Sequence, residues 1–316
     1  MRGYTILRQQ NPLPAAVPRF SQPGFFFNDA GHICQQSTQP FCVIAALNST
    51  TGQADARCTF FIGPDCAVSP AAAPFGSIEF MQTLPDSVLN DVLDALIDEA
   101  RSISVPTLRL VNYPHCYAPE QARRLTKCLL DREFRLTSND HTSFLPVTSD
   151  TFSGTIVASE RRRLKKCQRA GFQFRHWCCP DADAVVSFVV RTRQQRGHQL
   201  TLPPDRLKNL LQTFPDRFPV FVVRDGATVA ALMVAVRVRH DILYNFMPAS
   251  DPDYHVYSPM VMLVDGLFGY CQHQQIQLLD LGTSLDGNHQ PKPGLMRFKR
   301  NLGAQESPKL TFEKSF

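Results

Sequence analysis

Three consecutive strand-like segments in the second half of the chain constrain its fold more than any other feature. They cover residues 219–224, 228–239 and 242–247, and Asp225-Gly226 joins the first two. Asp-Gly between apolar runs is a strong hairpin signal, because both central residues of the favoured turn need a positive φ. Only two residues separate the second segment from the third. We therefore expect an antiparallel meander of three strands.

Helices and strands alternate on both sides of this meander. Residues 260–268 carry an apolar face at helical spacing, and Gly171 ends a basic helical segment that begins at Ile156. This order of elements predicts a domain of the mixed α+β kind. The predicted order is helix 156–170, strand 172–177, helices from Asp181 and near 204–211, the meander, helix 260–268, strand 276–281, helix 295–301 and strand 309–312.

The first half shows the same alternation in a looser form. Residues 41–47 and 57–62 are strand-like and flank a turn-prone stretch, so we expect them to pair as an antiparallel hairpin. A helix follows Pro85, with an apolar stripe that a sheet must cover. The remaining predicted elements are a strand over 107–111, a helix over 119–130 and a strand over 134–145.

The predicted domain boundary follows Pro146, where Thr148-Ser149-Asp150 is polar and turn-prone. Prolines within residues 1–40 prevent a regular helix or central strand, so this segment is expected to form an arm that packs through Phe25-Phe26-Phe27. The predicted organisation is an arm over 1–40, a first domain over 41–148 and a second domain over 149–316. The fold class is α/β, of the mixed α+β kind, with two similar domains in tandem.

Composition excludes several classes of protein. Of 316 residues, 43% are hydrophobic and the net charge is +5, which indicates a folded chain without the charge density of a nucleic-acid coat. No apolar run approaches the roughly 18 residues that a membrane helix needs, so we expect a cytoplasmic protein. The ten cysteines form no CxxC pair, which favours reduced and mostly buried thiols; the adjacent Cys178-Cys179 is unusual.

Short motifs in both halves give a family resemblance. The motifs are Ser69-Pro70, Ala73-Pro74-Phe75-Gly76-Ser77, Tyr244-Asn245-Phe246-Met247, Asp251-Pro252-Asp253-Tyr254, Tyr257-Ser258-Pro259, Asp280-Leu281-Gly282 and, the most specific, Arg297-Phe298-Lys299-Arg300-Asn301-Leu302-Gly303-Ala304. With these motifs, the chain resembles the tandem proteins of the Gcn5-related N-acyltransferase (GNAT) superfamily that include the Fem-type peptidyltransferases and the BioF2/CelD-like acyltransferases.

The resemblance implies two GNAT-like domains and acyl transfer to an amine by direct attack on an activated acyl group. The Fem-type proteins imply an aminoacyl-tRNA donor and a peptide acceptor, whereas the CelD-like proteins leave an acyl-CoA donor open. Neither a tightly bound cofactor nor a metal is expected. The alternative is a catalytically inactive GNAT fold that binds an anionic metabolite or carrier.

One loop departs from the GNAT pattern. The resemblance implies a glycine-rich loop before the central helix, whose backbone N–H groups hold the pyrophosphate of coenzyme A. Here residues 250–259 contain no glycine, carry Asp251 and Asp253, and lose two N–H donors to Pro252 and Pro259. We therefore predict weak or absent acetyl-CoA binding at this loop.

Lys299 and Asp280 are the predicted catalytic residues. The resemblance places the pair Phe298-Lys299 close to the reacting groups, where a lysine cation could bind donor phosphate or stabilise a developing oxyanion. Asp280 ends an apolar strand and could orient or deprotonate the attacking amine. The alternatives are a surface lysine and a carboxylate that caps the turn at Gly282.

Aromatic residues are predicted to line an acceptor groove. These are Tyr244, Tyr254, Tyr257 and Phe298, and the alternative for each tyrosine is a place in the core or at the rim.

Charged residues are predicted to bind substrate at two further places. Six basic residues lie between Arg161 and Arg169, and Arg162 and Lys166 in this run could grip the phosphates of a tRNA or another ligand. The alternative is a solvated helix. Glu79 could meet an acceptor hydroxyl or amine, and its alternative is a salt bridge to Arg57.

Overall fold

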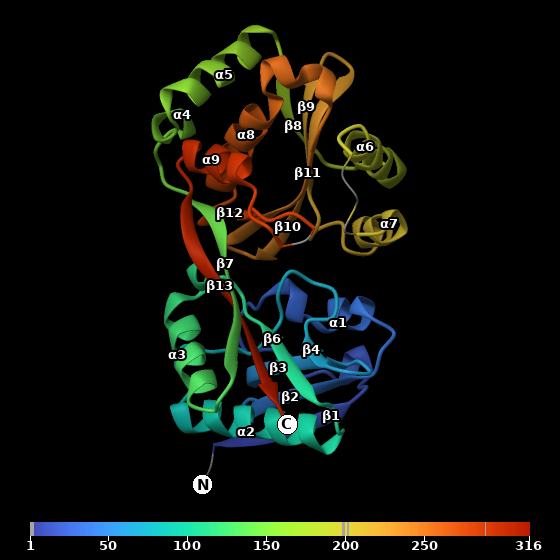
Figure 1. Ribbon diagram of the computed structural model, residues 1–316, viewed down its shortest axis with the longest axis vertical. Coiled ribbons are helices and arrows are strands. Elements are labelled where there is room, and N and C mark those ends of the chain that lie inside the picture. The colour runs from blue at the N-terminus through green and yellow to red at the C-terminus, as the bar shows by residue number, and fades with distance from the viewer. Residues whose placement is uncertain (1–2, 198–199, 201, 288) are drawn as a thin grey trace. The chain divides into compact units, whose positions relative to one another are not determined.

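The computed structural model describes residues 3–197, 200, 202–287 and 289–316 (Figure 1). Its described residues fall into two compact units. Unit 1 comprises Met1–His141 and Ser307–Phe316, and unit 2 comprises Thr142–Glu306. The sequence placed the boundary near residue 148 and the C-terminal segment in the second domain. The structure differs there, because the last strand pairs within unit 1.

The sheet of unit 1 begins as an antiparallel meander. Strands β1, β2, β3 and β4 pair in that order, β4 pairs in parallel with β6, and β6 pairs in antiparallel fashion with β13. The short strand β5 pairs with β3, and the sequence predicted neither β4 nor β5. The bounds are β1 (Tyr4–Gln10), β2 (Phe41–Asn48), β3 (Ala54–Ile62), β4 (Ala67–Ser69), β5 (Glu79–Phe80), β6 (Thr107–Val111) and β13 (Gln305–Ser315).

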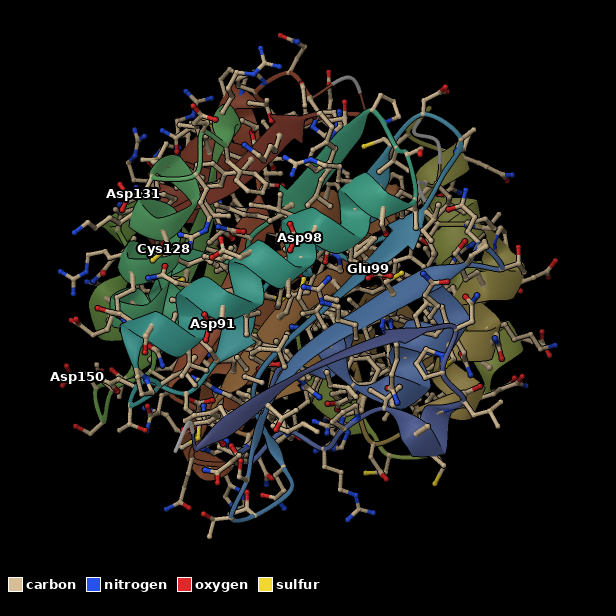
Figure 2. The ribbon with its side chains drawn as sticks, turned by 90° about the horizontal axis from the view of Figure 1, so that it is seen from below. Asp91, Asp98, Glu99, Cys128, Asp131 and Asp150 are labelled. Carbon is tan, nitrogen blue, oxygen red and sulfur yellow. The ribbon has the colours of Figure 1, made fainter. Side chains whose placement is uncertain are left out.

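Helix α2 (Asp86–Ser102) covers this sheet with the predicted apolar stripe, from Val88 to Ile97. Figure 2 shows Asp91, Asp98 and Glu99 along α2. Packing of the apolar stripe on the sheet removes it from water, which is what stabilises an amphipathic helix. The other helical segments of unit 1 are η1 (Pro14–Ala16), η2 (Phe26–Asn28), α1 (Ala30–Gln36), η3 (His115–Tyr117) and α3 (Pro119–Leu130).

The N-terminal segment forms part of unit 1. Phe25, Phe26 and Phe27 are buried, and the Phe25 ring packs on Phe75 and Tyr113 with centroids 5.4 and 4.9 Å apart. The packing role predicted for the three phenylalanines is confirmed. The segment also contributes β1, which precedes the prolines and therefore keeps the N–H groups that pair it with β2.

The sheet of unit 2 begins with the end of β7 (Arg135–Pro146), which pairs with β12 (Leu278–Thr283) in antiparallel fashion. β12 runs parallel to β11, and the predicted meander of β9, β10 and β11 is confirmed. β8 closes the order beside β9. The bounds are β8 (Gln173–Trp177), β9 (Val220–Asp225), β10 (Thr228–Arg239) and β11 (Ile242–Ser250).

Helices cover both faces of the sheet of unit 2. Figure 1 shows α6 and α7 on one side and α8 on the other. Leu263, Leu267 and Phe268 of α8 are buried in one cluster with Leu164 of α5 and Leu279 of β12. The bounds are α4 (Phe152–Thr155), α5 (Ala158–Arg169), α6 (Ala182–Gln194), α7 (Pro204–Thr213), η4 (Pro252–Tyr257), α8 (Pro259–His273) and α9 (Pro293–Asn301).

The two units follow one plan. Three antiparallel strands lead into a helix and then into a strand parallel to the third, as β2-β3-β4-α2-β6 in unit 1 and β9-β10-β11-α8-β12 in unit 2. The predicted α/β fold with two similar domains is therefore confirmed. Each plan is completed by a strand from another part of the chain: β13 follows unit 2 in sequence but pairs with β6, and β7 begins in unit 1 but pairs with β12.

Candidate functional site

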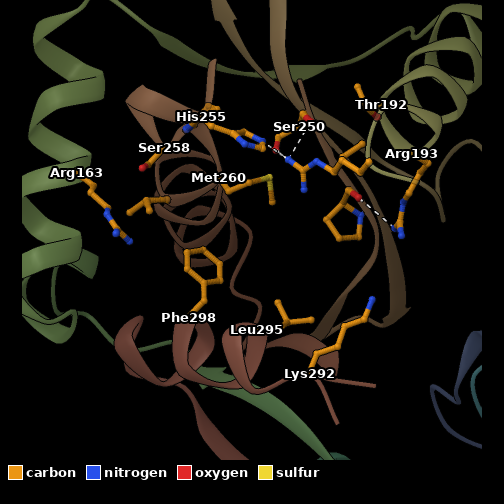
Figure 3. Close-up of a pocket in the computed structure, with 15 residues that line it drawn as sticks. Arg163, Thr192, Arg193, Ser250, His255, Ser258, Met260, Lys292, Leu295 and Phe298 are labelled. Carbon is orange, nitrogen blue, oxygen red and sulfur yellow. Dashed lines mark hydrogen bonds between the residues drawn. The ribbon is translucent and has the colours of Figure 1, made fainter. Parts of the chain in front are cut away.

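A cavity of about 580 Å³ opens in unit 2 at the N-terminus of α8 (Figure 3). Its wall is formed by the end of β11 at Pro248–Ser250, the start of α8 and the C-terminal end of α6. Leu295 and Phe298 of α9 supply an apolar side. The cavity therefore combines polar groups at one end with apolar surface at the other, as small-molecule sites commonly do.

The strand pairing explains why β11 borders this cavity. β11 and β12 pair only from Ile242↔Leu278 to Tyr244↔Asp280, whereas β11 continues to Ser250. Beyond Tyr244 the two strands no longer pair with each other in the described ladder. The last residues of β11 are thus free to border a ligand site. Open α/β sheets commonly bind ligands at such carboxyl ends of their strands.

The N-terminus of α8 borders the cavity, and the backbone turns sharply where it enters the helix. Ser258 has a φ of 56°, in the left-handed region, and Pro259 occupies the first helical position, where its missing N–H costs nothing. Ser258, Met260 and Val261 all line the cavity. The first N–H groups of a helix carry partial positive charge, so this end favours an anion.

Four cationic side chains line the same cavity: Arg163, Arg193, Arg196 and Lys292. Figure 3 shows Arg163, Arg193 and Lys292 reaching toward it from different elements. None of the described lining residues is acidic. The cavity is therefore electropositive, and an anionic ligand would offset the mutual repulsion of these charges.

Two of these arginines repel each other. Burial and then the neighbouring Arg196 charge lower the pKa of Arg193, and burial also lowers the pKa of Arg196. Arg193 donates to the carbonyl of Pro248 at 3.3 Å, and Arg196 donates to the Ser250 hydroxyl at 2.6 Å and contacts His255. These neutral acceptors orient the guanidinium groups without cancelling their charge.

Asp251 and Asp253, the two carboxylates of the glycine-free loop at residues 250–259, do not line the cavity. Asp251 is buried, caps η4 by accepting from the Asp253 N–H at 3.1 Å, and pairs with Arg191 at 3.1 Å. Asp253 is exposed. Neither acid therefore places an unpaired charge in the cavity, because Asp251 is neutralised by Arg191 and Asp253 faces solvent. The loss of N–H donors to proline remains, and weak acetyl-CoA binding stays a prediction.

Lys299 and Asp280 are buried and close enough for their charges to interact, and Lys299 follows the cavity-lining residue Phe298 in the chain. The Lys299 ammonium donates to the carbonyls of Gly282 and Thr283 at 2.7 and 2.8 Å. Burial lowers the pKa of Lys299 to about 8, and the nearby Asp280 charge partly opposes this shift. The predicted alternative of a surface lysine is wrong, since Lys299 is only 4% exposed.

Asp280 accepts hydrogen bonds from two neighbours. Its Oδ1 accepts from the Thr142 hydroxyl at 2.6 Å and from the Gly282 N–H at 2.7 Å, so the turn-capping role offered as the alternative is present. Tyr244 lies opposite Asp280 in the β11–β12 ladder. Burial and the Asp280 charge raise the pKa of Tyr244.

Comparison with known proteins identifies this part of the chain. Residues 157–300 match the family model described as the acetyltransferase (GNAT) domain. The chain carries a GNAT domain. A search of the curated proteins found no match to the sequence.

Solved structures extend the likeness beyond the GNAT domain. The crystal structure of FemX matches over 87% of this chain and 87% of its own, with a TM-score of 0.63 and 12% identity. A protein of unknown function from Bacteroides thetaiotaomicron matches over 95% and 94%, with a TM-score of 0.61 and 13% identity. For L-PGS from Bacillus licheniformis the coverage is 82% and 81%, the TM-score 0.57 and the identity 13%. At these identities the likeness establishes the fold, which is the tandem fold that the motifs indicated.

The predicted aromatic residues lie at three different places within the GNAT domain. Phe298 lines the cavity. Tyr254 and Tyr257 pack against Phe172, with ring centroids 5.7 and 5.1 Å apart, and neither lines the cavity. Their contacts are those of the predicted alternative, aromatic residues at the rim of the core. Tyr244 belongs to the Asp280 cluster.

The basic helix is confirmed as α5, and its charged side chains make different contacts. Arg162 is exposed, whereas Lys166 donates to the Val256 carbonyl at 2.8 Å and lies over the Tyr257 ring. Arg163 pairs with the buried Glu160 at 2.8 Å and also lines the cavity. The helix thus contributes directly to the GNAT cavity through Arg163.

Glu79 lies in unit 1, in a buried ion pair. Arg57 donates to Glu79 through Nε at 3.0 Å, and the Phe25 N–H donates to it at 2.5 Å. Arg57 also contacts Asp29 at 3.2 Å. The salt bridge offered as the alternative role of Glu79 is therefore present, and its contact with an acceptor stays a prediction.

Sequence reasoning missed Arg193, Arg196 and Lys292 as cavity residues. The first two belong to the cluster Arg191-Thr192-Arg193-Gln194-Gln195-Arg196 at the end of α6, a basic run that could have drawn attention. Nothing around Lys292 distinguishes it from a surface lysine.

Two further properties bear on function. No group of three or more histidine, cysteine, aspartate or glutamate side chains within the described ranges is placed to hold a metal ion. Along the same residues, every helix is too short or too polar to pass through a membrane.

Proposed function

We propose that the protein is an acyltransferase that moves an acyl or aminoacyl group from a phosphate-bearing donor to an amine. The observation that supports this most is the cavity of the GNAT domain, where Arg163, Arg193, Arg196 and Lys292 surround the N-terminus of α8. Phosphates are the donor groups that such a cationic, acid-free cavity would hold. Acyl-CoA and aminoacyl-tRNA both carry them.

The proposed reaction is direct attack of the amine on the activated acyl carbon. The new bond is C–N, the bond to the donor sulfur or oxygen breaks, and the proton that the amine releases passes to the departing sulfur or oxygen, which leaves as a thiol or a hydroxyl. Positioning in the cavity would supply much of the rate. Lys299 uses two of its three ammonium protons on carbonyls, which leaves one to stabilise the developing oxyanion. Asp280 is proposed to hold Lys299 and Tyr244 in place.

A binding module without catalysis is the second candidate, and one observation favours it. Lys299 is not among the residues that line the cavity, and its ammonium is bonded to backbone carbonyls. A GNAT fold could keep the anion site and lose the chemistry. In that case an anionic metabolite or carrier would bind at Arg193 and Arg196 and would leave unchanged.

The experiment that separates these functions is a transfer assay with radiolabelled acetyl-CoA and, in parallel, a pool of radiolabelled aminoacyl-tRNAs, each with a panel of amine acceptors. We expect transfer with one donor class. Arg193→Met removes a cavity charge and keeps the apolar stem, so it should raise the donor KM about tenfold or more. Arg123→Met on α3 of unit 1 is the matched control and should leave KM unchanged. Absence of transfer with both donors, together with tight binding of either, would favour the binding module.

The basic helix leads to a separate expectation. Arg162→Ala combined with Lys166→Ala should weaken binding of a tRNA-sized donor, and the slope of log affinity against log salt should become shallower by about one unit for each lost phosphate contact. The measurement is a salt titration of charged tRNA binding to both proteins. Parallel salt dependences would show that this face of α5 is merely solvated.

A further inference from the structure

The turn between β8 and α6 borders a second cavity, of about 550 Å³. It shares no lining residue with the cavity at the N-terminus of α8. The cavity is lined by His176, Trp177, Cys178 and Cys179 and, from other segments of the chain, by the aromatic residues Phe218 and Tyr270. The proposed acyl transfer uses none of these side chains. This cavity therefore needs its own explanation.

The exposed cysteine thiols of the chain lie at this cavity. Of the ten cysteines, only Cys178 and Cys179 are exposed. Burial raises the pKa of Cys42, Cys58 and Cys271 to about 12, which suppresses their thiolate forms at neutral pH. The remaining five are buried or half-buried. An electrophile in solution will therefore meet the cysteine pair of this turn first.

Cys178 has a proton acceptor beside it. Its Sγ lies 3.6 Å from His176 Nδ1, within the range of a sulfur hydrogen bond. The imidazole stacks on the Phe221 ring and contacts the Tyr270 ring, with centroids 4.9 and 5.3 Å apart, and these contacts fix its orientation. Burial lowers the pKa of His176, so the ring is neutral near pH 7 and can accept the thiol proton. Nucleophilic thiols are activated by such an adjacent base.

The charges of the cavity suit an anionic reagent that also carries an amine. Arg237 is half-buried in the lining, and within the described part of the chain no acidic side chain pairs with it. Asp216 is the acidic lining residue and is exposed. A small molecule with carboxylates and an ammonium group would complement both. Glutathione has this pattern of charge.

The spacing of the two cysteines determines which product would persist. The Cα atoms of adjacent residues lie about 3.8 Å apart across a trans peptide, below the separation of about 4.4 Å at which unstrained disulfides begin. Cys179 is therefore poorly placed to displace a group from Cys178. A mixed disulfide formed on Cys178 should remain until an external thiol removes it.

We propose that Cys178 is a modification site that forms a mixed disulfide with a small disulfide of the glutathione type. The Cys178 proton passes to His176, and the thiolate attacks one sulfur of the disulfide. A new S–S bond forms, the old one breaks, and the departing thiolate takes up the proton as free thiol. The disulfide reagent is the oxidant and is reduced to one thiol and one protein-bound half.

The test exposes the full-length protein to glutathione disulfide and follows the adduct by intact mass and peptide mapping. Trp177 is the only tryptophan of the chain and lines the cavity, so its emission provides a second readout. We expect one adduct, on Cys178, accompanied by a change in Trp177 emission. Cys178→Ser should lose both signals, and the matched variant Cys179→Ser should keep both. His176→Phe keeps an aromatic ring and should slow the reaction about tenfold or more.

Matched reagents test the role of the charge. Arg237→Met should slow the reaction with glutathione disulfide roughly fivefold or more, and should leave unchanged the reaction with the uncharged bis(2-hydroxyethyl) disulfide. Melting temperatures of the Cys178, Cys179 and His176 variants should stay close to that of the wild type, because these three residues are exposed. Adducts spread over several cysteines, an adduct confined to Cys179, or equal rates in the His176→Phe variant would overturn the assignment.

Discussion

Replacing Lys299 with methionine is expected to lower the turnover of acyl transfer about 100-fold or more, the usual cost of losing one donor to an oxyanion. Methionine keeps most of the apolar stem and removes the ammonium, which bonds the Gly282 and Thr283 carbonyls at 2.7 and 2.8 Å. Two carbonyls lose a partner, but a desolvated charge is also removed. These effects on stability oppose each other, so the melting temperature should change far less than turnover.

The control is Arg300→Met, one residue further along α9, where the side chain is 70% exposed. It should leave both turnover and melting temperature close to those of the wild type. A Lys299→Met protein that turns over normally, or whose turnover falls only as far as its folded fraction, would remove Lys299 from the reaction.

The titration of Lys299 gives this variant a distinctive pH dependence. The pKa is lowered by burial from 10.5 to about 8 in the folded protein, whereas the unfolded chain keeps the ordinary value. Between about pH 8 and 10.5 the unfolded state therefore binds a proton that the folded state has released, and stability rises with pH. Across this window, the melting temperature of the wild type should rise relative to that of the Lys299→Met variant. Turnover of the wild type should fall across it, because the oxyanion loses its cationic partner.

The local elements could be predicted from the sequence because each one carries its own signal. Periodicity and Pro or Gly at the ends predict α3 at Pro119–Leu130, and Asp225-Gly226 predicts the β9–β10 hairpin. The exchange of final strands was missed, because nothing in the sequences of β7 and β13 selects β12 or β6 as the partner. Pairing over such sequence separations is decided by packing.

The site was predictable where a motif marked it and hidden where topology assembled it. Phe298 and Lys299 stand in one recognisable motif and Asp280 in another, and the structure brings Lys299 and Asp280 close enough for their charges to interact. Arg193 and Arg196 become cavity residues only because the end of α6 packs against β11. The ion pair of Asp251 was hidden for a related reason, since its neutralising partner Arg191 lies sixty positions earlier in the chain.

Glu79 shows how a buried carboxylate can be tested for structure against function. Arg57→Met should destabilise the protein by about 3–5 kcal/mol, because it leaves Glu79 buried without its cation. Glu79 is 4% and Arg57 7% exposed, so water cannot take the place of the missing partner. The measurement is urea unfolding followed by circular dichroism. Arg8→Met, which breaks an exposed pair with Asp98, is the control and should cost no more than about 1 kcal/mol.

Glu79→Gln then separates the two roles that the sequence left open. The amide keeps the shape of the side chain and can still accept from the Phe25 N–H, but it leaves Asp29, at a longer distance, as the carboxylate partner of Arg57. If the ion pair is the whole role of Glu79, stability falls and the acceptor KM, measured well below the melting temperature, stays at the wild-type value. A raised acceptor KM at unchanged stability would instead place Glu79 in contact with the substrate, because only a ligand contact changes KM without changing the folded fraction.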